Sequence, residues 1–261
     1  MKKLLVLSMI TLFAFTGCKK ETPDPGTEVS SVSTDYKAFA VEFTATWCPY
    51  CGTYGFPAFE NMLENHKYKI TALSIHPDDD IVDDAYPAQD EFEDFYDCGG
   101  YPSAGVNVSV GGYPSDNYFN GQINTATNAN TATKAGVGIA SSVSGNTMTV
   151  NTKTVFFADV AGKINLAVYL VEDNIINDQN TTSTTIIDAE HDNVFRGSAG
   201  NTAWGSTITT GATKGTKLDG IYTIAIPADV RNKANLHVVA VLFVMNPTTG
   251  KPTAVLNSNA L

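Results

Sequence analysis

The chain has 261 residues, of which 16 are Lys or Arg and 27 are Asp or Glu, so its formal net charge is −11. A surface with this excess of acids repels nucleic-acid phosphates, and we expect no nucleic-acid partner. Four cysteines are too few for a disulfide-stapled scaffold, so a hydrophobic core must hold the fold.

Residues 1–17 have the pattern of a secretory signal, with Lys2 and Lys3 before an apolar run and small residues before Cys18. The apolar run is too short to cross a bilayer as a helix. The pattern resembles a bacterial lipoprotein signal, which implies that Cys18 becomes an acylated first residue and attaches the protein to a membrane. Ordinary cleavage that leaves Cys18 free is the alternative. Residues 18–34 are polar and contain Pro, Gly, Ser and Thr, which predicts a flexible tether.

A Cys-X-X-Cys pair, Cys48 and Cys51, lies at the junction of a predicted strand over residues 39–43 and a predicted helix over residues 48–65. A pair in this position is typical of redox proteins. The first sulfur faces free N–H groups and the positive end of the helix dipole, which favour the thiolate that attacks disulfides. A zinc site would need a second close pair of Cys or His, which the sequence lacks, so we expect no metal and no cofactor. A purely structural disulfide is the alternative.

The following elements alternate between strand and helix. The sequence predicts a strand over residues 70–75, a helix over 88–96, a strand over 104–110 and a helix over 117–128. This alternation is typical of an α/β domain. An acidic connection beginning with three consecutive aspartates follows the first of these strands. We interpret it as a solvated loop in preference to a calcium loop, because its spacing does not fit an EF-hand.

Two further features accompany the cysteines. Glu42 lies on the predicted strand six residues before Cys48, and Tyr101-Pro102 lies in a Gly-rich turn just before another predicted strand. Together with the Cys-X-X-Cys pair, these residues resemble the thioredoxin superfamily, which has a buried acid and a cis-proline at such positions. A Glu on the strand surface and an ordinary trans-proline in a turn are the alternatives.

The resemblance implies a thioredoxin-like domain over residues 35–128 and a role for each matching residue. It makes Cys48 the nucleophile and Cys51 the resolving thiol. Glu42 would accept the proton of Cys51, and Pro102 would face the disulfide. The platform on which a substrate polypeptide lies would consist of Trp47, Pro49, Tyr50 and Tyr101.

From residue 135 onward the character of the sequence changes. Alternating or β-branched apolar residues indicate short strands, for example over residues 164–171 and 236–245, and clusters of Gly, Asn and Thr separate them. Short strands at this spacing predict an antiparallel β-sandwich over residues 135–261. The length of the chain likewise favours two domains.

Three segments of this half carry a second resemblance: residues 171–174 (VEDN), 191–197 (HDNVFRG) and 254–257 (AVLN). They are similar to the outer-membrane-protein-28-related lipoproteins of Bacteroidetes-type bacteria. The resemblance implies a thioredoxin-like half followed by a β half, in a lipid-anchored protein of the bacterial outer membrane. We interpret His191 and Arg196, in the second segment, as part of an ion cluster at the edge of the sandwich with Glu190 or Asp192. A polar site formed by His191 and Arg196 is the alternative.

The sequence therefore predicts a membrane-anchored thiol-disulfide oxidoreductase that acts through Cys48 and Cys51. Its expected partners are exported proteins that carry disulfides or dithiols, together with an upstream redox partner. The alternative is a surface lipoprotein whose β-sandwich binds a protein or glycan, with an inert thioredoxin-like scaffold. Cys98 lies four residues before Pro102, and it either approaches the redox pair or is simply buried.

Overall fold

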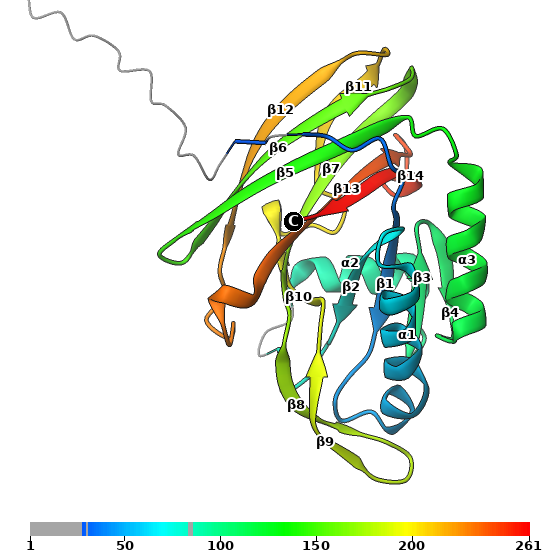
Figure 1. Ribbon diagram of the computed structural model, residues 1–261, viewed down its shortest axis with the longest axis vertical. Coiled ribbons are helices and arrows are strands. Elements are labelled where there is room, and N and C mark those ends of the chain that lie inside the picture. The colour runs from blue at the N-terminus through cyan, green and yellow to red at the C-terminus, as the bar shows by residue number, and fades with distance from the viewer. Residues whose placement is uncertain (1–27, 30, 83–85) are drawn as a thin grey trace, which may run out of the picture.

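The computed structural model describes residues 28–29, 31–82 and 86–261, which form a mostly β fold with several sheets and a few helices (Figure 1). The predicted signal over residues 1–17 and its acylation site Cys18 lie outside the described residues, as does most of the predicted tether.

The N-terminal part alternates between strands and helices, as the sequence predicts. The strands are β1 (Ala38–Phe43), β2 (Ile70–Ile75), β3 (Ser103–Val106) and β4 (Ser109–Gly112). The helices are the π-helical turn η1 (Cys51–Gly55), α1 (Phe56–His66), α2 (Pro87–Tyr96) and α3 (Asp116–Ala129). The prediction of one continuous strand over residues 104–110 is wrong, because Asn107 takes a φ of 55° and the chain turns back as the β3–β4 hairpin. Asn tolerates this left-handed conformation better than most residues do.

The C-terminal part is almost entirely β. Its strands are β5 (Ala135–Ser144), β6 (Thr147–Phe156), β7 (Val160–Glu172), β8 (Ile175–Asn180), β9 (Thr185–His191), β10 (Val194–Ser198), β11 (Ser206–Ala212), β12 (Lys217–Ala225), β13 (Leu236–Met245) and β14 (Pro252–Ala260). Two short 3-10 turns, η2 (Ala199–Asn201) and η3 (Lys233–Asn235), interrupt them. The strands pair with one another in the antiparallel sense, as predicted.

Strands from both parts of the chain belong to one large sheet, with the order β14-β13-β7-β10-β2-β1-β3-β4 and with β11 paired to β7. The join is a short parallel pairing of β10 with β2, in which Val194 lies opposite Ser74. Ser74 also donates its N–H to the carbonyl oxygen of Asn193 at 2.7 Å. The expectation of a separate sandwich over residues 135–261 therefore differs from the structure. The three-stranded sheet β12-β6-β5 forms a second layer. The strands β7, β10, β13 and β14 extend the large sheet that contains β1 and β2.

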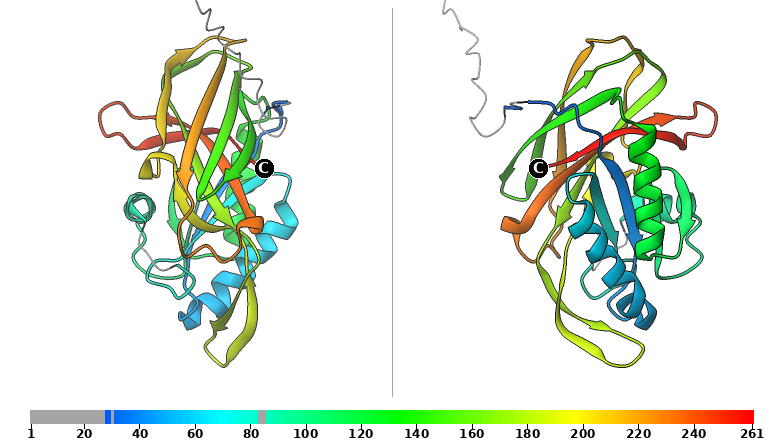
Figure 2. Two further views of the ribbon diagram at one scale, coloured as in Figure 1. Left: turned by 90° about the vertical axis from the view of Figure 1, so that its left-hand side faces the viewer. Right: turned by 45° about the vertical axis from the view of Figure 1, so that its right-hand side comes forward.

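The two faces of the large sheet carry different cores, because successive side chains of a strand point to opposite faces. Phe39 and Phe43 of β1 pack with α2 on one face, together with Tyr169 of β7. Ala38 and Ala40 pack with α1 and α3 on the other face. Figure 2 shows α2 and α1 on opposite sides of this sheet. Leu166 and its alternate neighbours on β7 pack against the three-stranded sheet, which covers the rest of the second face.

Part of the segment predicted to be a tether lies against the protein surface. A Cβ atom added to Gly136 would lie 2.5 Å from the carbonyl oxygen of Ser33, and one added to Gly138 would lie 2.4 Å from that of Ser31. The two glycines of β5 therefore let the backbone of residues 31–33 approach closely. The chain enters the fold along β5 before it turns into β1.

A buried charge cluster ties β10 to neighbouring segments. Arg196 is fully buried, and its Nε donates to Oε2 of Glu172 at 2.8 Å. Its Nη1 lies 3.2 Å from Oδ2 of Asp229. The predicted pairing of Arg196 with Glu190 or Asp192 is therefore wrong. A buried guanidinium has no water to solvate its charge and needs carboxylate partners. The fold provides Glu172 from β7 and Asp229 from the connection before β13.

Candidate functional site

Cys48 and Cys51 form a disulfide at the carboxyl end of β1. We call residues 44–50, between β1 and η1, the Cys48 loop. The helix predicted over residues 48–65 is present as η1 followed by α1. Pro57 lies in the first turn of α1, directly after η1.

Both cysteines are buried, Cys51 more completely than Cys48. Cys48 is 5 % exposed, whereas Cys51 is completely buried. The backbone N–H of Cys51 donates to Sγ of Cys48 at 3.1 Å. A donor in this position stabilises a thiolate at Cys48 once the disulfide is reduced. Cys48 is thus the less buried of the two residues, and the N–H of Cys51 favours the charged form of its sulfur.

Tyr101 and Pro102 lie directly beside the disulfide. The peptide bond between them is cis. The carbonyl oxygen of Tyr101 lies 3.8 Å from Sγ of Cys48. A Cβ atom on Gly55 would lie 2.7 Å from Cβ of Pro102, so the proline ring packs against the end of η1. The fold brings together the segments around residues 48 and 102, which are far apart in the sequence.

Glu42 of β1 is 1 % exposed and lies beneath η1, since a Cβ atom on Gly55 would be 3.0 Å from its Oε1. Burial raises its pKa to about 8, and the nearby charge of Glu60 adds to this effect, while a hydrogen bond from Ser74 opposes it. Among the described residues no partner reaches Oε1. A carboxyl with this pKa can release a proton near neutral pH, and its ionised form can take one up.

A small cavity lies next to Glu42. Its volume is about 10 Å³, which is room for one water molecule. Its lining contains Glu60, whose pKa burial and the charges of Asp192 and Glu190 raise to about 7. The lining also contains His191, whose pKa burial lowers to about 4, with the neighbouring His76 acting in the same direction. The cavity thus joins the buried carboxyl to a second, less buried one.

Exposed aromatic side chains lie on the Cys48 loop, on η1 and directly after β4. We call this group, Trp47, Tyr50, Tyr54 and Tyr113, the aromatic rim. Tyr54 lies within 6.3 Å of the ring of Tyr50 and 6.2 Å of that of Tyr113, measured between ring centroids. Trp47 contacts Tyr101 edge to face and donates its Nε1–H to the carbonyl oxygen of Asp78 at 3.0 Å. Pro49 is exposed between these rings.

Sequence reasoning missed a buried polar group that fixes the Cys48 loop. Oδ2 of Asp79 accepts the backbone N–H of Thr46 at 2.8 Å, and its other oxygen accepts the Thr46 hydroxyl. Nδ1 of His76 lies 2.7 Å from the same carboxylate. Burial opposes ionisation of Asp79, but these hydrogen bonds hold its pKa below the usual range. The acidic run 78–80 was the available signal, and we interpreted it as a solvated loop. Among the described residues no group of three or more His, Cys, Asp or Glu side chains is arranged to hold a metal.

A second missed contribution comes from the β8–β9 hairpin, which projects beyond the end of β1 and η1 (Figure 1). Gln179 and Asn180 of β8 form hydrogen bonds with the Cys48 loop, about 130 residues earlier in the chain. Cys98 is a free, half-buried thiol near Gly100, and burial raises its pKa.

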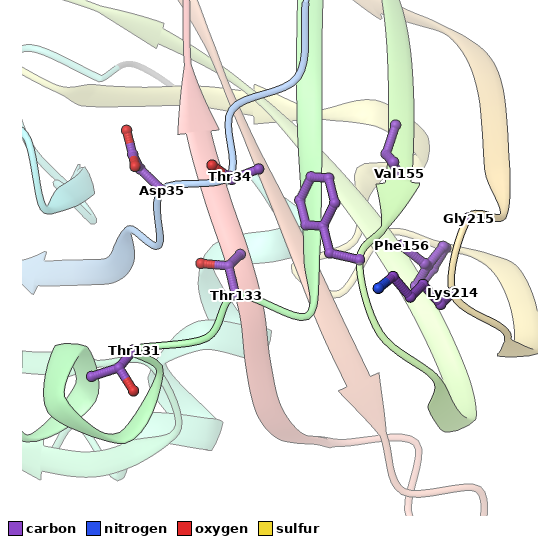
Figure 3. Close-up of a pocket in the computed structure, with 9 residues that line it drawn as sticks. Thr34, Asp35, Thr131, Thr133, Val155, Phe156, Lys214 and Gly215 are labelled. Carbon is purple, nitrogen blue, oxygen red and sulfur yellow. The ribbon is translucent and has the colours of Figure 1, made fainter.

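A larger cavity, of about 600 Å³, lies at the opposite end of β1 (Figure 3). Asp35, which precedes β1, lies on one side and Lys214 lies on the other. Because β1 has six residues at about 3.3 Å each, roughly 20 Å of strand separates this cavity from the disulfide. The full lining is Thr34, Asp35, Thr131, Thr133, Val155, Phe156, Phe157, Lys214 and Gly215.

Fold and site together define a β-rich protein with helices and a disulfide on a strand–helix loop. The family described as "Outer membrane protein Omp28" matches residues 89–260. The chain therefore belongs to the Omp28 outer membrane protein family, and the predicted location at the outer membrane is confirmed. The matched range includes Pro102 and begins after the Cys48 loop, so the family is defined here by the residues downstream of the disulfide.

Among solved structures, the chain is similar to HBP35 of Porphyromonas gingivalis, with a TM-score of 0.67 and 14 % sequence identity. The alignment covers 88 % of this chain and 76 % of that one, so the two proteins share a fold. No curated protein matches the sequence. Within the described part of the chain, no helix has the length and apolar character needed to cross a membrane.

Proposed function

We propose that this protein is a thiol-disulfide oxidoreductase of the bacterial outer membrane that acts on exported proteins. The observation that carries the proposal is the Cys48–Cys51 disulfide beside Tyr101-Pro102, in which Cys48 is 5 % exposed and Cys51 is completely buried. Disulfide exchange passes through a mixed disulfide, in which one cysteine bonds to the partner and the other remains a free thiol. A difference in burial between the two cysteines suits these two roles.

The N-terminal part is, in this proposal, a thioredoxin-like unit. The order β1-α1-β2-α2-β3-β4-α3 supports this interpretation, as do the parallel pairing of β1 with β2 and the antiparallel pairing of β1 with β3. The buried Glu42 supports it as well.

In the reducing direction, the Cys48 thiolate attacks one sulfur of a substrate disulfide. A mixed disulfide forms, and the other substrate sulfur leaves as a thiolate that takes a proton from water. In its ionised form Glu42 then accepts the proton of Cys51, and the Cys51 thiolate attacks Sγ of Cys48. The second substrate sulfur leaves and is protonated, and the Cys48–Cys51 disulfide forms with the loss of two electrons to the substrate. A dithiol redox partner restores the reduced pair, and the reverse sequence oxidises a substrate dithiol.

The substrate polypeptide lies, in this proposal, on Trp47, Pro49, Tyr50 and Tyr101. Their exposed apolar surface supports a contact with an unfolded or extended segment. Acylation of Cys18 would hold the enzyme at the membrane, where exported proteins pass.

Substitution of the two cysteines tests the proposal. Cys48→Ser removes the attacking sulfur, so turnover of a model disulfide should fall to the uncatalysed rate. Cys51→Ser leaves the attack intact but removes resolution, so mixed disulfides with envelope proteins should accumulate on Cys48 and be identifiable after non-reducing electrophoresis. Cys98→Ser serves as the matched control and should retain turnover. Full activity of Cys48→Ser would contradict the proposal.

The cavity of about 600 Å³ favours a second function, binding of a protein or glycan by the β part, with the disulfide as an inert scaffold. Its size suits a ligand, and hydroxyl, aromatic and Lys side chains line it. Iodoacetamide labelling of the protein across a series of glutathione redox buffers distinguishes the two functions. A Cys48–Cys51 pair that is half reduced within the range of known exchange proteins favours the enzyme, and a pair that stays oxidised far below this range favours the scaffold.

A further inference from the structure

The β8–β9 hairpin inserts a buried amide into the Cys48 loop. Gln179 is completely buried. Its Nε2 lies 3.2 Å from the carbonyl oxygen of Ala45, 3.1 Å from that of Thr46 and 3.4 Å from that of Cys48. The carbonyl oxygen of Asn180 also lies 3.1 Å from Nε2. A side-chain amide has two N–H donors, so these four carbonyl groups share them. One side chain from the β part, which is distant in the sequence, thus forms hydrogen bonds with carbonyl groups on both sides of Trp47.

The backbone of the hairpin adds further contacts. The N–H of Asn180 donates to the carbonyl oxygen of Thr46 at 2.8 Å. The N–H of Thr182 donates to Oγ1 of Thr53 at 2.9 Å. These bonds fasten the hairpin to the loop before Cys48 and to η1 after Cys51.

The hairpin and η1 approach more closely than most side chains would allow. A Cβ atom on Gly52 would lie 2.1 Å from the carbonyl oxygen of Asn180 and 2.8 Å from Cγ of Gln179. The absence of a side chain at Gly52, the residue after Cys51, permits this contact. The hairpin therefore touches the chain immediately next to both cysteines.

The position of the Cys48 loop affects a hydrogen bond to the reactive sulfur. Cys51 donates its N–H to Sγ of Cys48 at 3.1 Å, and this geometry exists only while the loop and the first turn of η1 keep their relative positions. Hydrogen bonding to the charged form of a group favours that form. A loop that moved away would lose this donor and with it part of the stabilisation of the Cys48 thiolate.

From these contacts we infer that the β8–β9 hairpin, through Gln179, positions the Cys48 loop and thereby holds the N–H of Cys51 against the reactive sulfur. Gln179 is a positioning residue that does not touch substrate. The inference rests on the proposed redox function, because it concerns the reactivity of the same pair. It also means that the β part, in addition to its place in the sheet, completes the redox site.

The test measures the thiolate rather than the fold. In the full-length protein with Cys98→Ser, Gln179→Met keeps the volume of the side chain and removes both donors. We expect the apparent pKa of Cys48, obtained from the pH dependence of iodoacetamide alkylation of the reduced protein, to rise by about one unit, which lowers the alkylation rate near pH 6 about tenfold. The equilibrium with glutathione should shift at least threefold toward the protein disulfide, because the reduced form loses stabilisation.

Gln89→Met is the matched control. Gln89 is equally buried and accepts the N–H of Tyr86 at the start of α2, so this variant loses stability in the same manner. The pKa of Cys48 in this variant and its equilibrium with glutathione should equal those of the parent. The comparison therefore distinguishes a general loss of stability from a change in the reactivity of the Cys48 sulfur.

The outcomes distinguish the inference from the proposed function. A parent protein whose Cys48 reacts like an ordinary thiol and turns over no disulfide contradicts the proposed function. A reactive parent whose Gln179→Met variant has an unchanged Cys48 pKa and glutathione equilibrium overturns the inference alone. If Gln179→Met does not fold, the double variant Asn180→Ala/Thr182→Ala keeps the backbone bonds but removes two side-chain contacts of the hairpin. These are the bond from Nδ2 of Asn180 to the carbonyl oxygen of Trp47 at 3.4 Å and the bond between the hydroxyls of Thr182 and Thr53 at 3.1 Å. The double variant should shift both values in the same direction, and no shift overturns the inference.

Discussion

At the scale of single residues, Glu42 links the site to the stability of the protein. Burial raises its pKa to about 8, with Glu60 adding to the effect, against an ordinary value of 4.5. Between these two pH values the folded protein keeps a proton that the unfolded chain has lost. The stabilisation from this proton is fully present below pH 4.5 and is lost as the pH rises through 8.

Glu42→Gln should therefore gain stability relative to the parent as the pH rises. Gln has the same shape but does not ionise, so it removes the penalty of charging a buried carboxyl. We expect the difference in unfolding free energy between variant and parent to grow from pH 5 to pH 8, by at most about 1.4 kcal/mol per pH unit. Urea denaturation at each pH measures it. Curves that stay parallel across this range would show that Glu42 is not the buried acid described above.

The residues nearest the sulfurs could be predicted because their signals are local. The apolar neighbours of Glu42 indicated a buried strand, and the Gly-rich turn drew attention to Pro102. The contact between Asp79 and Thr46 could not be predicted in the same way. This contact depends on how the connection after β2 folds back over the Cys48 loop. The sequence does not reveal it, because a run of aspartates is typical of a solvated loop.

At the scale of elements, the fit between η1 and the β8–β9 hairpin depends on Gly52. Gly52→Ala places a methyl group 2.1 Å from the carbonyl oxygen of Asn180, where only backbone movement can relieve the clash. We expect a loss of about 1–3 kcal/mol in unfolding free energy. Denaturant unfolding of the oxidised protein measures the loss.

Gly121→Ala provides a control of opposite sign. Gly121 lies within α3, and a Cβ atom there meets nothing within 4 Å. Ala favours the helix, so this variant should gain about 0.5–1 kcal/mol. A Gly52→Ala protein as stable as the parent would mean that the hairpin does not press on η1.

The helices and most strands could be predicted from periodicity and from turn residues, but the position of this hairpin could not. The sequence of β8, IINDQN, ends in four consecutive polar residues, which is typical of an exposed segment. Only the folded chain shows that its buried polar residue, Gln179, faces a loop instead of solvent. Similarly, the pairing of β10 with β2 rests on very few residues and leaves no pattern in the sequence.

At the scale of the whole molecule, the two halves share one core. Phe39 of β1 stacks on Tyr169 of β7 with ring centroids 5.8 Å apart, and it meets Phe243 of β13 at 6.1 Å. Phe92 of α2 lies 6.1 Å from Phe195 of β10. The change in sequence character near residue 130 therefore marks a change in secondary structure within a continuous hydrophobic core.

A fragment that ends at residue 134 should not fold by itself. It keeps the disulfide, but it exposes the aromatic face of β1 and α2 that Tyr169, Phe195 and Phe243 cover in the full chain. We expect poor dispersion in its amide NMR spectrum and no cooperative thermal transition. A fragment with a sharp transition and native redox behaviour would contradict this expectation.

The close packing of residues 31–33 on the two glycines of β5 has a consequence for orientation. The polypeptide enters the molecule at one end of β1 (Figure 1), and the Cys48–Cys51 disulfide follows the other end of this strand. If lipid at Cys18 attaches the protein to the bilayer on the side where residues 31–33 enter the fold, the aromatic rim faces away from the lipid headgroups. Partners would then dock from the aqueous side, without having to slip between protein and membrane.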